Sequence, residues 1–579
     1  MGMVASKTAL AAVRFGTFEV DFESRELRKR GLRVRLEEKP FQILELLLER
    51  PGGVVTRQTL REKLWPDTHV GYEQSLNTAV NKLRELLGDS SQSPRFVETL
   101  PRVGYRFIAP VDRPGRTQTY AAKKMLVVLP LENLCGDPEQ EFFAEGLTEE
   151  LISHVGQLNP KRLGVIARTS AIQYKGSKKT IGEIASELGV EYVVEGSVRC
   201  QESGVRVTAQ LINARDQTHL WAASYDRELR DILAVQHDLA RQVVKALAVE
   251  LLPGQEAVRS AADPAAHEAY LRGRFFAGQR SEDALMKAIA CFEQALSLDP
   301  NCARASYGIA DCSGLLSWFG ALFPREAGQR AAEAASRALQ IDDTLGEAHA
   351  SMGLVRYWFE WDWFAAEQEF LRAIELNPSY ASGHQWYASF LGAMGRLEEA
   401  RAEHELARHL DPLSLIISMG AADPYFCARQ YDQAIAHLRG ILEQEPRFFP
   451  ALFNLGRACV QKGMYSEAIA AFEKAVQLSG NREGRPALAH AYAKAGRTGV
   501  ARSILAEMKI HTGGRYVASP MIARIHLGLG DIDKAFEWLR KGIEERSYWI
   551  VFLKMDPVYD EIRSDPRFVD LLRAARLAE

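Results

Sequence analysis

The sequence predicts three successive regions of different fold class: a small α+β domain, an α/β domain and an all-α repeat array. Its 579 residues are too many for one hydrophobic core, so several domains are expected. Short strand-like runs mixed with helices occupy residues 1–112, and strand-like runs separated by helical stretches occupy residues 125–252. From about residue 264 onward the sequence is helical, and one pattern recurs every 34 residues.

The first region combines short strands, three helices and a hairpin. Its first helix, in "EKPFQILELLLERPGG", has Pro40 in its first turn, and the second, in "VVTRQTLREKLWP", has Thr56 as its N-cap. A hairpin from Phe96 to Phe107 places apolar residues on both sides of a Pro-Arg-Val-Gly corner. The third helix, in "GYEQSLNTAVNKLRELLGD", has apolar residues spaced i, i+4, i+7 and i+11, which predicts one buried face: Leu76, Val80, Leu83 and Leu87.

The opposite face of this third helix is predicted to be polar and exposed. Asn and Gln side chains can pair with adenine edges, and Arg or Lys can bind guanine or phosphate. The residues on this predicted face are Gln74, Asn77, Thr78, Asn81, Lys82 and Arg84. Together they are candidates for reading DNA. The other interpretation of the same pattern is a solvated helix face in a domain that contacts only proteins.

These three motifs, in this order, resemble the OmpR/PhoB-type winged-helix DNA-binding domain over residues 13–110. The resemblance implies that the helix around Asn77–Arg84 enters the major groove of double-stranded DNA. It further implies that the hairpin is a wing, with Arg102 at its tip reaching an adjacent minor groove beside Gly104 and Tyr105. The resemblance also implies phosphate contacts from Thr56, Arg57 and Trp65.

The distribution of charge along the chain favours a polyanion partner for residues 1–112 only. Residues 1–112 contain 18 Lys and Arg against 15 Asp and Glu, a net charge of +3, whereas the whole chain carries −3. The third helix has only Lys82 and Arg84 as basic residues, which predicts low affinity for each monomer. A homodimer on DNA or tandem sites would compensate.

Residues 111–124, "VDRPGRTQTYAAKK", are polar and aperiodic and are predicted to be a linker. Residues 125–252 resemble the amino-terminal domain of TolB. The acidic cluster that begins at Glu132 and includes Glu141 and Glu145 is predicted to mark an exposed helix start, with a metal site as the alternative. The run Arg168-Thr169-Ser170 is expected to end a strand, with anion binding as the alternative. No motif for a catalytic, cofactor or metal site is found, so none is predicted.

The helical region resembles tetratricopeptide repeats. Its repeats end at Pro378, Pro412, Pro446 and Gly480, steps of 34 residues. The array is expected over residues 264–547, with a helical cap at 548–579, and its groove is expected to bind a protein partner. Gly456 is expected where the two helices of a unit approach closely, and Phe472 is expected to fill the gap to the next unit. Trp361 and Trp363 are predicted to be the more exposed members of an aromatic segment.

The remaining predictions concern location and chemistry. No run of eighteen apolar residues occurs, so no transmembrane helix is expected, and the protein is predicted to be cytoplasmic. The seven scattered cysteines are expected to be reduced thiols.

The predicted architecture is a winged helix-turn-helix (α+β), then an α/β domain, then an all-α tetratricopeptide superhelix. Together these features predict a sequence-specific transcriptional regulator that is not an enzyme. Its array is expected to bind a protein partner or to mediate self-association, and so to control DNA binding. Its domain order resembles that of ToxR/CadC-like regulators. The alternatives are a repeat scaffold whose winged helix no longer binds DNA, and an enzyme with unrecognised chemistry in residues 125–252.

Overall fold

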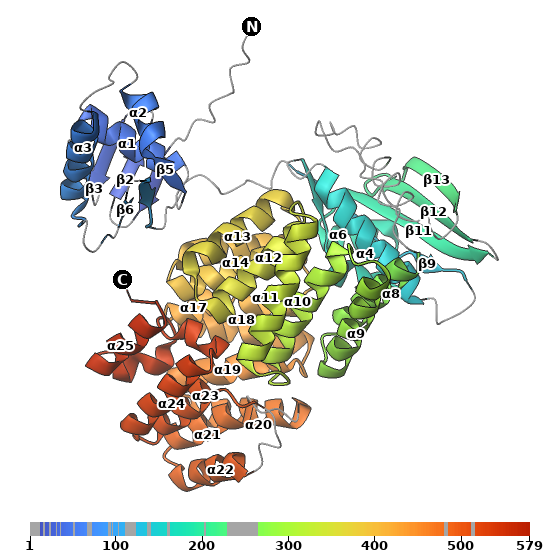
Figure 1. The fold of residues 1–579 in the computed structure, drawn as a ribbon. Helices are drawn as coiled ribbons and strands as arrows, with labels where there is room; N and C mark the ends of the chain where they lie inside the picture. The colour runs from blue at the N-terminus through green and yellow to red at the C-terminus, as the bar shows by residue number, and fades with distance from the viewer. Residues whose placement is uncertain are drawn as a thin grey trace. The chain divides into compact units, whose positions relative to one another are not determined.

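The protein folds as two compact units, residues 1–119 and 120–579 (Figure 1). The computed structural model describes residues 12–15, 18–22, 25–29, 32–34, 36–49, 53–65, 72–90, 94, 96–101, 103–109, 123–135, 141–158, 162–201, 204–227, 242, 264–479, 484–510 and 516–578. The predicted linker at 111–124 lies almost entirely outside these residues. No helix among them is long and apolar enough to cross a membrane.

The first unit consists of two small antiparallel sheets and three helices. Four strands run in the order β1 (Ala12–Phe15), β2 (Phe18–Asp21), β3 (Glu26–Lys29) and β4 (Leu32–Val34). The helices are α1 (Glu38–Glu49), α2 (Arg57–Leu64) and α3 (Tyr72–Leu87), and a second sheet has the order β5 (Val54–Thr56), β7 (Gly104–Phe107), β6 (Val97–Leu100). Helices and hairpin fall where the sequence predicts them.

One aromatic cluster joins the first sheet to the hairpin. The ring of Phe15 lies 4.9 Å from that of Phe107 and 5.7 Å from that of Phe96, both edge to face. The apolar face of α3 packs on the same core, since Leu76, Val80, Leu83 and Leu87 are all buried. The predicted 3.6-residue periodicity of this helix is therefore confirmed. The hairpin and α3 are held by a shared core and keep a fixed relation to each other.

The hairpin is the predicted wing, with β6 and β7 in antiparallel register from Val97↔Phe107 to Leu100↔Gly104. Strand β5 pairs with the other edge of β7, and Gly104 lies opposite Thr56. A Cβ atom on Gly104 would lie 2.2 Å from the Val55 carbonyl oxygen, so no other residue fits here without moving the backbone. The strand pair thereby brings the N-terminus of α2 beside the wing.

The second unit begins with a mixed sheet of order β10 (Leu163–Val165), β8 (Lys124–Val128), β11 (Tyr192–Gln201), β12 (Gly204–Asn213), β13 (His219–Arg227). The short strand β9 (Glu132–Asn133) also pairs with β11. Strands β10, β8 and β11 are parallel, whereas β11, β12 and β13 are antiparallel. Helices α4 (Glu141–Leu158), α5 (Arg168–Ala171) and α6 (Ile181–Leu188) complete this α/β domain, with the 3-10 helix η3 (Ile172–Tyr174) after α5. The predicted α/β class is confirmed.

The rest of the unit is an array of helix pairs followed by a terminal segment. Eight pairs occur in the described residues: α8 (Pro264–Gly278) with α9 (Glu282–Leu298), α10 (Ala303–Trp318) with α11 (Pro324–Ile341), α12 (Gly346–Val355) with α13 (Trp363–Leu376), α14 (Ala381–Met394) with α15 (Leu397–Leu410), α16 (Leu415–Gly420) and α17 (Asp423–Cys427) with α18 (Tyr431–Gln444), α19 (Phe449–Gln461) with α20 (Tyr465–Ser479), α21 (Gly484–Lys494) with α22 (Thr498–Ile510), and α23 (Ser519–Gly528) with α24 (Ile532–Glu544). The segment η5 (Arg356–Glu360) continues α12, and η6 (Tyr548–Phe552), η7 (Pro557–Ile562) and α25 (Pro566–Ala574) end the chain.

Glycines set the spacing inside the helix pairs. A Cβ atom on Gly456 would lie 2.6 Å from the ring of Phe472 on the paired helix, which confirms the expected close approach at Gly456, and Gly353 meets Phe370 in the same way. Each phenylalanine is almost fully buried. A small residue on the first helix and a large one on the second therefore form the contact that the repeats share.

The α/β domain packs directly against the repeat array. Figure 1 shows α8 beside α4, and two ion pairs cross this interface, Arg274 with Glu149 and Arg304 with Glu150. Of these four side chains Glu150 is buried, and Arg274, Glu149 and Arg304 are about one-fifth exposed. Further along, the Ala167 amide donates to the Leu410 carbonyl at 2.8 Å. The interface is continuous over the first four helix pairs, so these two domains form one structural unit.

The structure corrects one prediction about the aromatic segment. Trp361 is 1% exposed, has a left-handed φ of 56° and carries the Arg546 guanidinium 4.3 Å above its ring. The prediction that Trp361 is exposed is therefore wrong, because a residue distant in the sequence covers it. Trp363 is half-buried, and its indole donates to the Arg576 carbonyl at 2.6 Å.

Two further sequence predictions concern cysteines and acidic residues. Five cysteines are free thiols, as expected: Cys291, Cys302, Cys312, Cys427 and Cys459. Cys135 is disulfide-bonded, so the expectation of a reduced thiol is wrong there. Glu145 belongs to the helix start at α4 but is buried and binds Arg168 and Lys175, at 2.6 Å in each case. The acidic residues at the start of α4 are therefore not all exposed, contrary to the expectation.

Candidate nucleic-acid interface

Helix α3 presents a polar face to solvent along its whole length. Gln74, Asn77, Thr78, Asn81 and Lys82 are all exposed, as predicted. Because α3 buries its apolar side against α1 and the wing, these five side chains share the remaining face. Amide, hydroxyl and ammonium groups on one exposed helix face suit hydrogen bonding to base edges and phosphates.

A hydrogen-bonded group fixes Asn77 within this face. The Tyr105 hydroxyl donates to Asn77 Oδ1 at 2.9 Å, and Arg57 donates to the same oxygen at 3.3 Å and to the Tyr105 hydroxyl at 3.1 Å. Burial raises the pKa of Tyr105, while Arg57 opposes this shift, so the hydroxyl stays a donor at neutral pH. The Asn77 oxygen is thus occupied from within, and its amide nitrogen is left to donate outward.

Tyr105 itself does not lie on the surface. It is 2% exposed, and its ring packs in the core with the Arg57 guanidinium 5.2 Å from its centroid. Gly104 is also buried. The two predicted wing residues therefore support the candidate interface from inside the domain. Of the described residues at the wing corner, Pro101 and Val103 are exposed, Val103 at 52%. Arg102, the predicted tip, lies outside the described residues.

Arg84 is also placed differently from the prediction. It is buried, and its guanidinium donates to the Val97 carbonyl at 2.6 Å and to the Thr99 hydroxyl at 2.8 Å. The expectation that Arg84 belongs to the exposed face is wrong, because strand β6 takes its donors. Arg84 fastens the wing to α3 and does not face outward.

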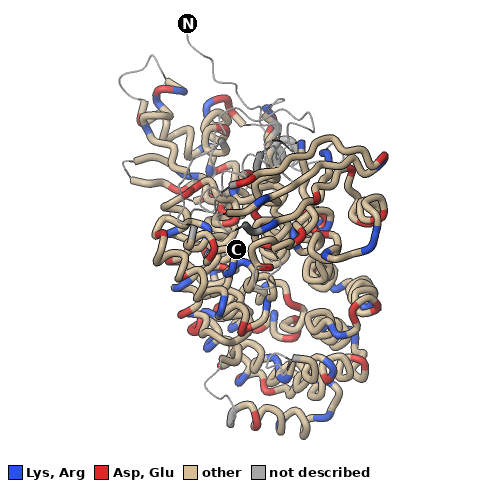
Figure 2. The backbone as a smooth tube through the Cα atoms, turned by 90° about the vertical axis from the view of Figure 1, so that its right-hand side faces the viewer, with Lys and Arg blue, Asp and Glu red and all other residues tan. Residues whose placement is uncertain are grey.

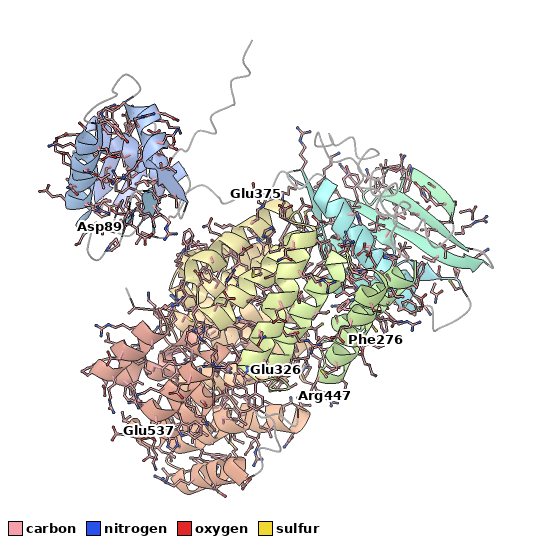
Figure 3. The ribbon with its side chains drawn as sticks, in the orientation of Figure 1. Asp89, Phe276, Glu326, Glu375, Arg447 and Glu537 are labelled. Atoms are coloured by element: carbon pink, nitrogen blue, oxygen red, sulfur yellow. The ribbon has the colours of Figure 1, made fainter. Side chains whose placement is uncertain are left out.

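Asp89 makes a second contact that holds the wing to α3, and this contact was not predicted from the sequence. Its carboxylate, at the end of α3 and labelled in Figure 3, accepts from the Val97 amide at 2.7 Å and from the Phe96 amide at 3.1 Å. An Asp just after a helix and before a strand is the sequence signal that could have suggested it. Together Arg84 and Asp89 hold β6 in a fixed position relative to α3.

Lys82 is exposed but already has an intramolecular partner. Its ammonium group lies 2.8 Å from one Glu37 carboxylate oxygen and 2.9 Å from the other. Both side chains are about half exposed or more, so the pair is weak and can exchange for a phosphate. Glu37 is therefore a competitor for any anion that binds Lys82.

The start of α2 is organised as predicted. The Thr56 hydroxyl caps the helix by accepting from the Thr59 amide at 3.1 Å. Arg57 is the first helical residue, and its backbone amide donates to the Val103 carbonyl at 3.0 Å, which ties α2 to the wing corner. Trp65 ends α2, half-buried, with the Lys39 ammonium 5.3 Å from its ring centroid. Phosphate contacts from these three residues remain predictions.

Sequence comparisons agree with the two outer parts of this architecture. Residues 31–107 match the model of the C-terminal domain of transcriptional regulatory proteins. Residues 420–483, and separately 286–302 and 521–547, match tetratricopeptide repeat models. With the strand and helix order above, the predicted fold class is confirmed: a winged helix, a sheet-containing middle region and a helical repeat array.

Individual relatives cover different shares of the chain. "Putative adenylate cyclase 3" of Rhizobium meliloti is 36% identical over 242 residues, 41% of this chain and 41% of that protein. "Transcriptional regulator HilA" of Salmonella typhimurium is 24% identical over 405 residues, 69% of this chain and 70% of that protein. The cholera toxin homolog transcriptional activator of Vibrio parahaemolyticus is 41% identical over 108 residues, 18% of this chain and 36% of that protein. The chain thus spans less than half of the first relative.

Among solved structures, the DNA-binding domain of Klebsiella pneumoniae RstA, in complex with the RstA box, is 28% identical. The match covers 17% of this chain and 96% of the RstA chain, with a TM-score of 0.16.

Proposed function

We propose that this protein is a transcriptional regulator that binds double-stranded DNA in a sequence-specific way through α3. The observation that carries the proposal is the exposed face of Gln74, Asn77, Thr78, Asn81 and Lys82, on a helix whose domain matches the regulator model. Helix α3 would lie in the major groove, with its amide side chains reading base edges. Arg102 would extend the contact into the minor groove, and Thr56, Arg57 and Trp65 would bind phosphates.

The test is binding of the full chain to DNA from its own upstream region, measured by fluorescence anisotropy at several salt concentrations. Gln74→Ala should cost about 1–3 kcal/mol if its contact is to a base edge, and should relax the preference at one base pair. The matched control is Gln294→Ala, on the exposed side of α9 in the repeat array. If the wild-type chain shows neither a salt slope nor any sequence preference, the proposal is wrong and the scaffold alternative takes its place.

The roles of the other parts are also proposals. The array would bind a protein partner or self-associate, and a homodimer on DNA would raise the low affinity of one winged helix. The α/β domain, with its resemblance to the amino-terminal domain of TolB, would link these functions. Sedimentation with and without a two-site DNA fragment tests the dimer, since a monomeric chain on both sites would contradict it.

We propose a cytoplasmic, non-enzymatic protein over the enzyme alternative. The similarity to a named regulator extends over 69% of this chain, whereas the similarity to the putative cyclase extends over 41%. Incubation of the full chain with ATP and divalent cations, followed by assay for cyclic AMP, tests this directly. Formation of cyclic AMP would overturn the non-enzymatic assignment.

A further inference from the structure

The inner side of the repeat array contains a cavity of about 530 Å³ walled by aromatic rings. It is lined mainly by the first helices of successive pairs, from α10 to α19, and by η6 from the end of the chain. Its rings include Trp318, Trp358, Trp386, Phe453, Trp549 and Phe552. A cavity of this size and character is in the range that holds a small molecule.

The C-terminal segment η6 limits the extent of this cavity along the array. Segment η6 lines the cavity with Tyr548 and Trp549, and the ring centroid of Tyr548 lies 5.9 Å from that of Trp358. On the other side, a neighbouring cavity of about 460 Å³ lies between the α/β domain and the array, and shares Leu315, Trp386 and Phe448 with the aromatic one. Because η6 closes one flank, the aromatic cavity suits a compact ligand better than an extended peptide.

One acidic side chain in the wall has no counter-charge in contact. Asp423, the first residue of α17, lines the cavity and makes no ion pair or hydrogen bond with its side chain in the described part of the chain. The pKa of Asp423 is raised to about 6, because burial and the nearby Asp556 raise it more than Arg457 lowers it. Arg457 is itself paired with Asp556 at 2.9 Å, which leaves Asp423 without a partner. A carboxylate in this position gains most from a ligand that brings a positive charge.

The same wall already binds a cation over its rings. The Arg457 guanidinium lies 4.5 Å from the centroid of Phe426 and 5.6 Å from that of Trp549. Aromatic faces beside a carboxylate are the combination that recognises organic ammonium groups. The apolar remainder of the wall fits a hydrocarbon or aromatic substituent on that group.

We propose that this cavity is a binding site for a small organic cation, an amine or quaternary ammonium group that carries an apolar substituent. The positive group lies beside Asp423 and the aromatic faces, and the apolar part fills the space between α14 and α19. This site is separate from the winged helix, and the proposal does not depend on DNA binding.

The test uses benzyltrimethylammonium as probe and neopentylbenzene, its neutral carbon isostere, as comparison. Binding to the full chain is measured by tryptophan fluorescence and by calorimetry up to millimolar probe. The cation should bind and the isostere should bind about thirtyfold more weakly or not at all, because a desolvated cation–π contact is worth about 2 kcal/mol. Equal binding of the two, or no binding of the cation, would overturn the proposal.

Two variants locate the site. Asp423→Asn keeps the shape and should weaken the cation about tenfold or more without affecting the isostere. Asp570→Asn, at an exposed position on α25, is its control and should change nothing. Unchanged affinity in Asp423→Asn would show that the carboxylate does not bind the probe, and would overturn the proposal.

Gly392 offers a blocking variant that should not damage the fold. It lines the cavity within α14, is buried, and a Cβ atom added there would have no heavy atom within 4 Å. Gly392→Leu should therefore fill the cavity, abolish binding and leave the melting temperature equal or higher, since leucine favours a helix over glycine. Gly440→Leu, on α18 and equally unobstructed, is the matched control and should bind normally. Normal binding by Gly392→Leu would place the probe elsewhere and contradict the proposal.

Discussion

Two basic residues of α3, Lys82 and Arg84, have opposite environments although only one residue separates them. Lys82 is exposed and pairs with Glu37, whereas Arg84 is buried and bonded to strand β6. Helical periodicity places Arg84 at the border between the two faces, so the sequence does not decide its direction. The carbonyl that captures it belongs to Val97, 13 residues further along the chain. The exposed amides of α3 could be predicted from the sequence, because they lie well inside the polar face.

The pairing of Lys82 predicts a gain of DNA affinity on removal of its partner. Glu37→Gln frees the ammonium group for phosphate, and should strengthen binding about twofold to fivefold at low salt and steepen the salt dependence. The neighbouring Glu38→Gln is the control, because Glu38 binds Arg25 at 2.8 Å and leaves Lys82 untouched. Anisotropy titrations of both variants on one DNA site make the comparison. Equal affinities for the two variants would show that Lys82 does not reach the DNA.

At the scale of elements, helices and strands with a local signal were the most predictable. The 34-residue spacing of the repeats, the cap at Thr56 and the wing hairpin all depend on neighbours in the sequence, and all are found. The burial of Trp361 could not be predicted in this way, because the residue that covers it is Arg546. The same limit applies to the aromatic cavity, where the C-terminal segment η6 supplies part of the wall.

The glycine–phenylalanine contact inside a repeat predicts a large effect from one methyl group. Gly456→Ala places a Cβ atom against the Phe472 ring in a closely packed core, and should destabilise the array by about 1–3 kcal/mol. Gly440→Ala, in a second helix and free of any neighbour within 4 Å, should instead stabilise it by about 0.5–1 kcal/mol. Thermal unfolding of the two variants gives the comparison. A melting temperature that rises in both would show that the Gly456 contact relaxes easily.

At the scale of the whole molecule, the described part of the repeat array carries charges of both signs side by side. Figure 2 shows Lys and Arg interspersed with Asp and Glu over the repeat array. One internal charge contact lies at the junction of the α/β domain with the array, where Arg304 meets the buried Glu150. Burial alone would raise the pKa of Glu150, but Arg304 and the nearby His154 and His267 lower it to about 2. This carboxylate therefore stays ionised in the folded protein.

Removal of Arg304 should destabilise this junction in a pH-dependent way. Arg304→Met leaves Glu150 buried without its partner, which should cost about 3–5 kcal/mol at pH 7. The double variant with Glu150→Gln should recover most of the loss. Because the folded pKa of Glu150 is below its unfolded value of 4.5, the stabilisation is present above pH 4.5 and is lost as the pH falls towards 2. Denaturation at pH 7 and pH 4 should show a smaller gap between wild type and Arg304→Met at the lower pH. A constant gap would contradict the assignment.

The same ion pairs determine which parts of this protein can be exchanged as modules. A gene fusion that moved the repeat array without the α/β domain would leave Arg274 and Arg304 without their carboxylates and would uncover the apolar surface around α8. The α/β domain and the array therefore have to be inherited, or cloned, as one cassette. The N-terminal unit, whose core is its own, can be replaced by another domain without that penalty.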